Sequence, residues 1–68
     1  MYFTENFRSK AAAKRALAAG QNVRVRRTSE FESLTAGQHS VEGPWSPDHH
    51  TFYGTVTIEE GGRVTKIA

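Results

Sequence analysis

The sequence has no cysteine, only two prolines and a single tryptophan among its 68 residues. Without cysteine, neither a disulfide framework nor a zinc site with cysteine ligands can hold the fold together. No apolar run approaches the roughly 20 residues of a membrane-spanning helix, and the N-terminus lacks the basic-then-apolar order of a signal peptide. We therefore expect a cytoplasmic protein with no membrane partner, whose fold depends on packing or on self-association.

Length and composition predict one small folded domain over residues 1–68. A chain of 68 residues lies near the lower limit at which one hydrophobic core outweighs chain entropy. Hydrophobic residues make up 37% of the sequence and aromatic residues 10%, which argues against disorder. A second domain is excluded by length alone.

Charge is distributed unevenly along the chain. Residues 1–29 contain seven basic residues and one glutamate, a net +6, whereas residues 30–68 contain two basic and six acidic residues, a net −4. If a helix and a strand present the basic side chains on one side, they form a patch that attracts phosphates or an acidic protein surface. If they lie on different sides, they are solvated surface charges. The basic residues in question are Arg8, Lys10, Lys14, Arg15, Arg24, Arg26 and Arg27.

The C-terminal third predicts a β-hairpin. Residues 51–59 and 64–67 are rich in β-branched and aromatic residues, and Gly61-Gly62 lies between them, where a tight turn needs positive φ. Pairing Glu60 with Arg63 sets Val56 opposite Ile67 and Thr57 opposite Lys66. A three-residue loop that pairs Glu59 with Arg63 is the alternative. The first register predicts a core face of Phe52, Gly54, Val56, Ile58, Thr65 and Ile67, with Val64 on the other face.

An alanine-rich segment predicts a helix over residues 10–19. Ser9 is suited to the N-cap and Gly20 to the position that ends the helix. On a helical wheel Ala12, Ala13, Ala16 and Leu17 share one face. This face of small residues allows close packing on a sheet, with Leu17 as its one large side chain.

The remaining segments predict further strands and a loop. Residues 1–7 contain three aromatic residues, which favours an extended segment lying against the sheet. Residues 23–27 alternate, with the valines inward and Arg24 and Arg26 outward. Residues 38–42 are suited to a short strand, and Phe31 and Leu34 are expected to pin the preceding loop. The expected fold is α+β, with one N-terminal helix packed on a three- or four-stranded antiparallel sheet that ends in the hairpin.

Histidines and carboxylates offer weak signals for chemistry. Asp48 and His50, with His39 facing them, could form a three-ligand metal site, but their spacing matches no zinc signature. His49 and His50 are adjacent and point to opposite sides of an extended chain. No nucleophile turn or glycine-rich phosphate loop is present. We therefore expect no enzymatic activity, no metal and no cofactor.

Aromatic residues near two prolines are candidate contact anchors. Pro44 and Pro47 constrain the loop that carries Trp45, and a rigid aromatic beside such a loop is typical of an interface hot spot. Core burial is the commoner outcome for Trp45. Tyr53, on the open face of its strand, is the better surface candidate.

Several segments together resemble small orphan proteins of bacteriophages and other mobile elements. They are the alanine-rich segment 9–20, Val-Arg-Val at 23–25, Val-Glu-Gly-Pro-x-x-Pro-x-x-His-x-Phe-Tyr-Gly-x-Val at 41–56 and Gly-x-Val-x-x-Ile at 62–67. The resemblance implies a phage-type accessory protein in the cytoplasm of a bacterial host. Such proteins often bind and inhibit a host machine, including immune complexes of the anti-CRISPR kind. It brings no established activity with it.

The sequence therefore predicts a non-catalytic protein that binds, and inhibits, a host protein or ribonucleoprotein. The expected contacts are the seven basic residues of the first half together with Trp45 and Tyr53. Direct, sequence-independent binding of nucleic acid by the same basic residues is the alternative. A homodimer formed by pairing of edge strands is a third arrangement that the sequence allows.

Overall fold

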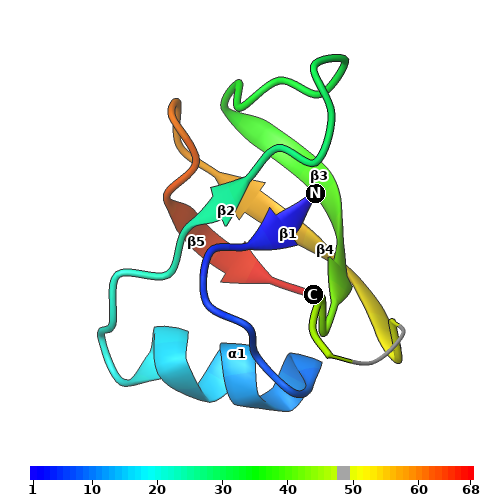
Figure 1. The fold of residues 1–68 in the computed structure, drawn as a ribbon. Helices are drawn as coiled ribbons and strands as arrows, with labels where there is room; N and C mark the ends of the chain where they lie inside the picture. The colour runs from blue at the N-terminus through cyan, green and yellow to red at the C-terminus, as the bar shows by residue number, and fades with distance from the viewer. Residues whose placement is uncertain (48–49) are drawn as a thin grey trace.

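The computed structural model describes residues 1–47 and 50–68 and has an α+β fold. The described strands form two antiparallel sheets, one of two strands and one of three, in the orders β1-β2 and β3-β4-β5. Figure 1 shows the smaller sheet in front of the larger one, with the helix across one end of both. The elements are β1 (Tyr2–Phe3), α1 (Lys10–Ala18), β2 (Val25–Arg26), β3 (Gly37–Gly43), β4 (Phe52–Ile58) and β5 (Val64–Ile67).

Backbone hydrogen bonds join the two sheets at both edges. On one side, the Val25 amide donates to the Gly62 carbonyl at 2.9 Å and the Val64 amide donates to the Val23 carbonyl at 2.8 Å. On the other side, the Glu42 amide donates to the Met1 carbonyl at 3.2 Å. The strands therefore follow one another around a ring in the order β1, β2, β5, β4, β3, which approaches a closed barrel.

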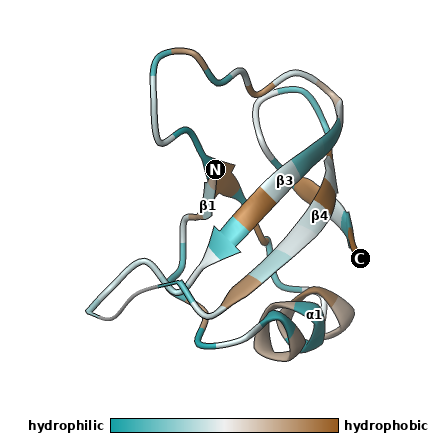
Figure 2. Cartoon of the chain, turned by 90° about the vertical axis from the view of Figure 1, so that its right-hand side faces the viewer, coloured by the Kyte–Doolittle hydropathy of each residue, from teal (hydrophilic) through white to brown (hydrophobic). Residues whose placement is uncertain are grey.

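The core fills the inside of this ring. Phe3 is 1% exposed and packs edge-on against Phe7, so the N-terminal segment lies against the sheet as predicted. In Figure 2, apolar stretches alternate with polar ones along β3 and β4, as expected for strands with one buried face. The buried hydrophobic residues are Met1, Phe3, Phe7, Ala13, Ala16, Val23, Val25, Val41, Val56, Ile58, Val64 and Ile67.

The helix has the start and the buried face that the sequence predicts, and it ends at Ala18, one residue earlier than predicted. The Ser9 hydroxyl accepts a hydrogen bond from the Ala12 amide at 3.1 Å, and Gly20 follows the helix with φ 84°. Ala13 and Ala16 are buried, and Leu17 packs against the core from a half-buried position. The helix is the second element rather than the first, because Tyr2–Phe3 forms a strand before it.

The hairpin combines features of both predicted registers. Val56 pairs with Ile67 and Thr57 with Lys66, as in the preferred register, but Ile58 pairs with Val64 after a bulge. The Glu59 amide then donates to the Arg63 carbonyl at 2.8 Å, which is the three-residue loop of the alternative. The bulge turns Val64 into the core and leaves Thr65 exposed, so the prediction for these two side chains was wrong.

Glycine at position 54 allows a close backbone approach. A Cβ atom there would lie 3.1 Å from the Ala68 carbonyl oxygen and 2.9 Å from Cδ of Lys10. The Ala68 amide donates to the Thr55 carbonyl at 2.8 Å, so the end of the chain lies against β4. A larger side chain at position 54 would therefore collide with the end of the chain and with Lys10.

Two further predictions need correction. A single sheet of three or four strands is wrong, because the five described strands divide between two sheets and only Val25–Arg26 of residues 23–27 forms a strand. Phe31 does not pin its loop, since it is 91% exposed. Hydrogen bonds from the Thr28 amide and hydroxyl to Glu32, each 2.6 Å, hold that loop instead. Leu34 does pack against the core.

Among the residues that the structure describes, no helix is long and apolar enough to cross a membrane.

Candidate binding surface

A cation lies over two aromatic rings on the outside of the smaller sheet. The guanidinium carbon of Arg26 is 5.2 Å from the centroid of the Tyr2 ring and 5.1 Å from that of Trp45. Tyr2 is the strand partner of Arg26 across the β1-β2 pair, and Trp45 comes from the connection between β3 and β4. These distances are those of cation-π contacts, which hold an arginine in place while leaving its charge unneutralised.

Hydrogen bonds to the N-terminal segment fix the position of Trp45. Its indole N–H donates to the Phe3 carbonyl at 3.0 Å, and its amide donates to Oδ1 of Asn6 at 2.8 Å. The Asn6 side chain also donates to the Ser46 carbonyl. Because Phe3 is itself in the core, the loop of Trp45 is tied to the rigid part of the molecule.

The aromatic contacts continue from Tyr2 to Tyr53 through His50. The Tyr2 hydroxyl lies 2.9 Å from Nε2 of His50, and Nδ1 of His50 lies 3.4 Å from Oε2 of Glu42. A carboxylate only accepts, so we place the imidazole proton on Nδ1 and let Tyr2 donate to Nε2. The His50 ring also meets the Tyr2 and Tyr53 rings edge-on, with centroids 5.3 and 6.4 Å apart.

We define the cation-aromatic surface as Arg26, Tyr2, Trp45, His50 and Tyr53. Tyr53 is its most prominent aromatic side chain, at 66% exposure, which agrees with the prediction for its face of the strand. Trp45 is half-buried, between the two outcomes that the sequence left open. The structure therefore brings Arg26 and Trp45 into contact and connects both to Tyr53 through Tyr2 and His50.

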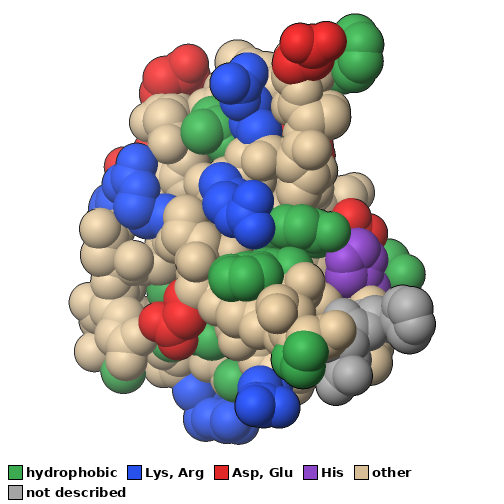
Figure 3. Space-filling view, in the orientation of Figure 1, with side chains coloured by type: hydrophobic (Ala, Val, Ile, Leu, Met, Phe, Trp, Pro, Cys, Tyr) green, Lys and Arg blue, Asp and Glu red, His purple; other side chains and the backbone are tan. Residues whose placement is uncertain are grey.

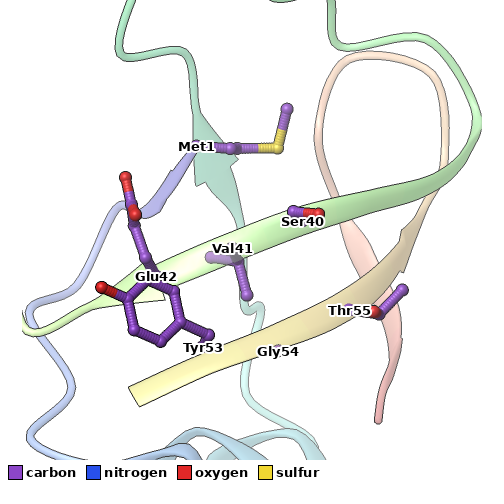
Figure 4. Close-up of a pocket in the computed structure, with 7 residues that line it drawn as sticks. All are labelled: Met1, Ser40, Val41, Glu42, Tyr53, Gly54 and Thr55. Carbon is purple, nitrogen blue, oxygen red and sulfur yellow. The ribbon is translucent and has the colours of Figure 1, made fainter. Parts of the chain in front are cut away.

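A shallow hollow of about 410 Å³ lies beside Tyr53. Figure 4 shows Tyr53 and Glu42 together at one end of the hollow, Ser40 and Thr55 at the other, and Met1 along one side. Ser40 is the strand partner of Thr55, and Glu42 is the partner of Tyr53. The backbone at Val41 and Gly54 completes the lining, so hydroxyl groups and one carboxylate supply its polar side chains.

The other basic residues do not gather at this surface. On the face in Figure 3, Lys and Arg side chains lie in separate groups with acidic side chains between them. Arg24 donates from Nη2 to the Gly61 carbonyl at 3.1 Å, at the junction of the two sheets. Lys10, Lys14 and Arg15 belong to the helix, which lies across one end of both sheets. Arg8 and Arg27 are exposed on the segments that precede the helix and follow β2.

The basic residues of the first half keep their charges free of ion pairs within the described chain. The ion pairs in residues 1–47 and 50–68 join the Met1 ammonium to Glu32 and Arg63 to Glu59, and the Glu42 carboxylate lies beside His50. None of these pairs uses one of the seven basic residues. Within the described residues, Arg26 therefore contacts aromatic rings and no carboxylate is paired with it.

The structure does not assemble the alternative metal site from the residues it describes. No group of three potential ligands is present within residues 1–47 and 50–68. His39 lies 2.7 Å through Nε2 from the Thr35 carbonyl, to which it donates. Asp48 and His49 lie outside the described residues, so the predictions that involve them concern a part of the chain with no described structure.

Sequence reasoning missed Tyr2 and His50 as members of the cation-aromatic surface, and Glu42 as the neighbour of His50. Tyr2 is the second residue of the sequence and is brought to Arg26 by a two-residue strand pair. His50 was considered for metal binding and not for contacts with aromatic rings. The one available signal was the concentration of aromatic residues in residues 1–7, which predicted a segment packed on the sheet but not its neighbours.

No protein-family model matches this sequence, and comparison with curated proteins and with solved structures gives no significant match.

Proposed function

We propose that the chain is a non-catalytic binding protein that docks on another protein through the cation-aromatic surface. The observation that supports this most is the Arg26 guanidinium held over the rings of Tyr2 and Trp45. Arginine, tyrosine and tryptophan are the residues most enriched in interface hot spots, and tyrosine and tryptophan bury a large area with little loss of side-chain freedom. Here internal contacts already restrict the rings, which lowers the entropic cost of binding.

The resemblance to phage accessory proteins suggests which partner to test first. A host protein or ribonucleoprotein in the bacterial cytoplasm is the expected target, and its inhibition, as by anti-CRISPR proteins, is the expected effect. The free charges of Arg26 and of the basic helix would speed association with an acidic surface, and the aromatic contacts would slow dissociation.

Affinity capture from a bacterial host lysate tests this function. With Arg26→Glu, the captured partner should be lost, because the substitution reverses the charge over the two rings. Lys66→Glu is the matched control, since Lys66 is exposed on β5 and lies outside the cation-aromatic surface. Thermal unfolding measurements show whether both proteins are folded. If they are, capture of the same partner by Arg26→Glu and by the wild type would rule the proposal out.

Direct binding of nucleic acid is the second candidate. A guanidinium beside exposed aromatic rings is suited to phosphates and to base stacking. Nuclease treatment before capture separates the two functions, because a partner that is lost on digestion favours nucleic acid and a retained one favours protein. Retardation of single-stranded DNA or RNA that weakens steeply with salt would support the second candidate.

A further inference from the structure

The outer edge of β3 carries backbone groups that the fold leaves open. The Ala68 amide donates to the Thr55 carbonyl, so the backbone groups of Thr55 point away from β3 and those of Gly54 and Val56 point toward it. Their strand partners, Val41 and His39, therefore use their backbone groups within the sheet. The backbone groups of Gln38, Ser40 and Glu42 point away from β4. On that side the Glu42 amide donates to the Met1 carbonyl.

Strand β1 covers only one end of this edge. Met1 reaches Glu42, and within the described part of the chain no backbone bond is formed by Gln38 or Ser40 on this side. Both residues are exposed. Each offers one N–H and one C=O in strand geometry, which is the arrangement that an added strand uses.

The hollow beside this edge is suited to a positively charged side chain. Ser40 and Glu42 project into it from the edge strand, and Tyr53 and Thr55 project from β4. Side chains of an added strand that share this face would lie next to Ser40 and Glu42 as cross-strand neighbours. The Glu42 carboxylate and the Tyr53 ring, which both line the hollow, attract a cation.

We propose that the β3 edge binds an extended segment of a partner protein as an additional strand. A lysine or arginine of that segment occupies the hollow beside Glu42. This rests on the proposed protein-binding function, because Tyr53 and His50 belong to the cation-aromatic surface as well. The same partner would then contact Arg26 and the β3 edge together.

A second copy of this chain fits the edge less well. Pairing two β3 edges would bring Gln38 of one copy opposite Ser40 of the other. On the face of the hollow, the second copy would then contribute its own Gln38, Ser40 and Glu42. None of these side chains is basic, so a homodimer supplies no cation for either hollow. Charge complementarity therefore favours a basic segment from another protein.

Binding of a labelled short peptide tests the inference. The probe alternates threonine and valine and has one central lysine, and the control probe has glutamate at that position. The lysine probe should bind and shift the backbone amide resonances of Gln38 and Ser40. Glu42→Gln should weaken its binding about tenfold, the effect of losing one charged contact. Equal binding of the two probes, or no binding at millimolar probe, would overturn the inference.

Ser40→Pro tests the edge without breaking the sheet. The Ser40 amide points away from β4, so a proline removes only an outward donor, which edge strands tolerate. The variant should unfold within a few degrees of the wild type and should no longer bind the lysine probe. Thr55→Ser, on the other strand of the hollow, is the control that should keep it. Retained binding by a folded Ser40→Pro variant would overturn the inference.

Two further results separate this inference from the proposed function. If Ser40→Pro still captures the lysate partner while Arg26→Glu loses it, docking stands and strand addition fails. If Arg26→Glu still captures the partner while Ser40→Pro no longer binds the lysine probe, strand addition stands and docking through the cation-aromatic surface fails. Sedimentation of the wild type as a dimer, with Ser40→Pro a monomer, would assign the edge to a second copy and overturn the inference.

Discussion

At the scale of single residues, Glu32 connects the loop after β2 to the start of β1. Its carboxylate lies 2.8 Å from the Met1 ammonium and accepts two hydrogen bonds from Thr28. The ammonium contact, followed by the two bonds from Thr28, lowers the pKa of Glu32 from 4.5 to about 2. A carboxylate so stabilised favours the folded state as long as it stays ionised.

The pH dependence of folding follows from this shift. Because the pKa is lower in the folded chain, the contribution of Glu32 is complete above about pH 4.5 and disappears as the pH falls to about 2. Glu32→Gln should therefore unfold at lower urea than the wild type at neutral pH, and the difference should close over this range. Glu30→Gln removes an equal charge from an exposed position of the same loop and is the control. A constant difference between Glu32→Gln and wild type down to pH 2 would contradict the assignment.

At the scale of the elements, what is local in the sequence was predictable and what is tertiary was not. Ser9 and Gly20 define the ends of α1 through interactions within a few residues, so its limits were predicted closely. The hairpin register near Val56 was also predicted, from apolar alternation. The bulge of the hairpin was not predicted. It accompanies the hydrogen bond from the Val64 amide to the Val23 carbonyl, which joins residues 41 positions apart in the sequence.

The helix depends on Leu17 as its large packing residue. Ala13 and Ala16 pack closely but bury little area, and Leu17 is half-buried against the core. Leu17→Ala should therefore lower the free energy of unfolding by about 2 kcal/mol, the lower end for a leucine truncation. Lys14→Ala on the exposed side of α1 should change it by less than about 0.5 kcal/mol. Equal midpoints of the two variants in urea would show that α1 does not use Leu17 as an anchor.

At the scale of the whole molecule, Gly62 lies at the junction of the two sheets, against the backbone of Val25. A Cβ atom there would lie 2.9 Å from the Val25 carbonyl oxygen, and φ is 106°. Gly61 also has positive φ, at 92°, but its nearest atom would be the flexible end of Arg24 at 4.0 Å. A substitution at either position would be strained by the positive φ, and the two positions differ in the space that surrounds them.

This difference predicts unequal effects of the same substitution. Gly61→Ala should destabilise the fold by about 1 kcal/mol through strain alone. Gly62→Ala should cost about 1 to 3 kcal/mol more, because the Val25 carbonyl cannot move without opening the junction. Equilibrium unfolding in urea measures both. Equal losses would mean that the junction tolerates a methyl group and does not depend on this close approach.

The arrangement of the two sheets could not be predicted from the sequence, for a physical reason. β1 and β2 are two residues each, too short for a period to be recognised, and they are defined by the partners that they meet. The candidate surface shares this limit. Trp45 and Tyr53 were expected as contacts from local composition, but their connection to Arg26 requires Tyr2 to pair across the sheet.

The position of β1 between β2 and β3 also affects how the chain folds during synthesis. Residues 1–3 gain their first strand neighbour at residues 25–26 and their second at residue 42, while β2 must wait for residues 62–64. The pairing of β1 and β2 with the rest of the ring cannot be completed before residues 62–64 have left the ribosome. Closure of the ring is therefore a late step in folding, and Phe3 and Phe7, which are buried in the fold, lack part of their surroundings until then.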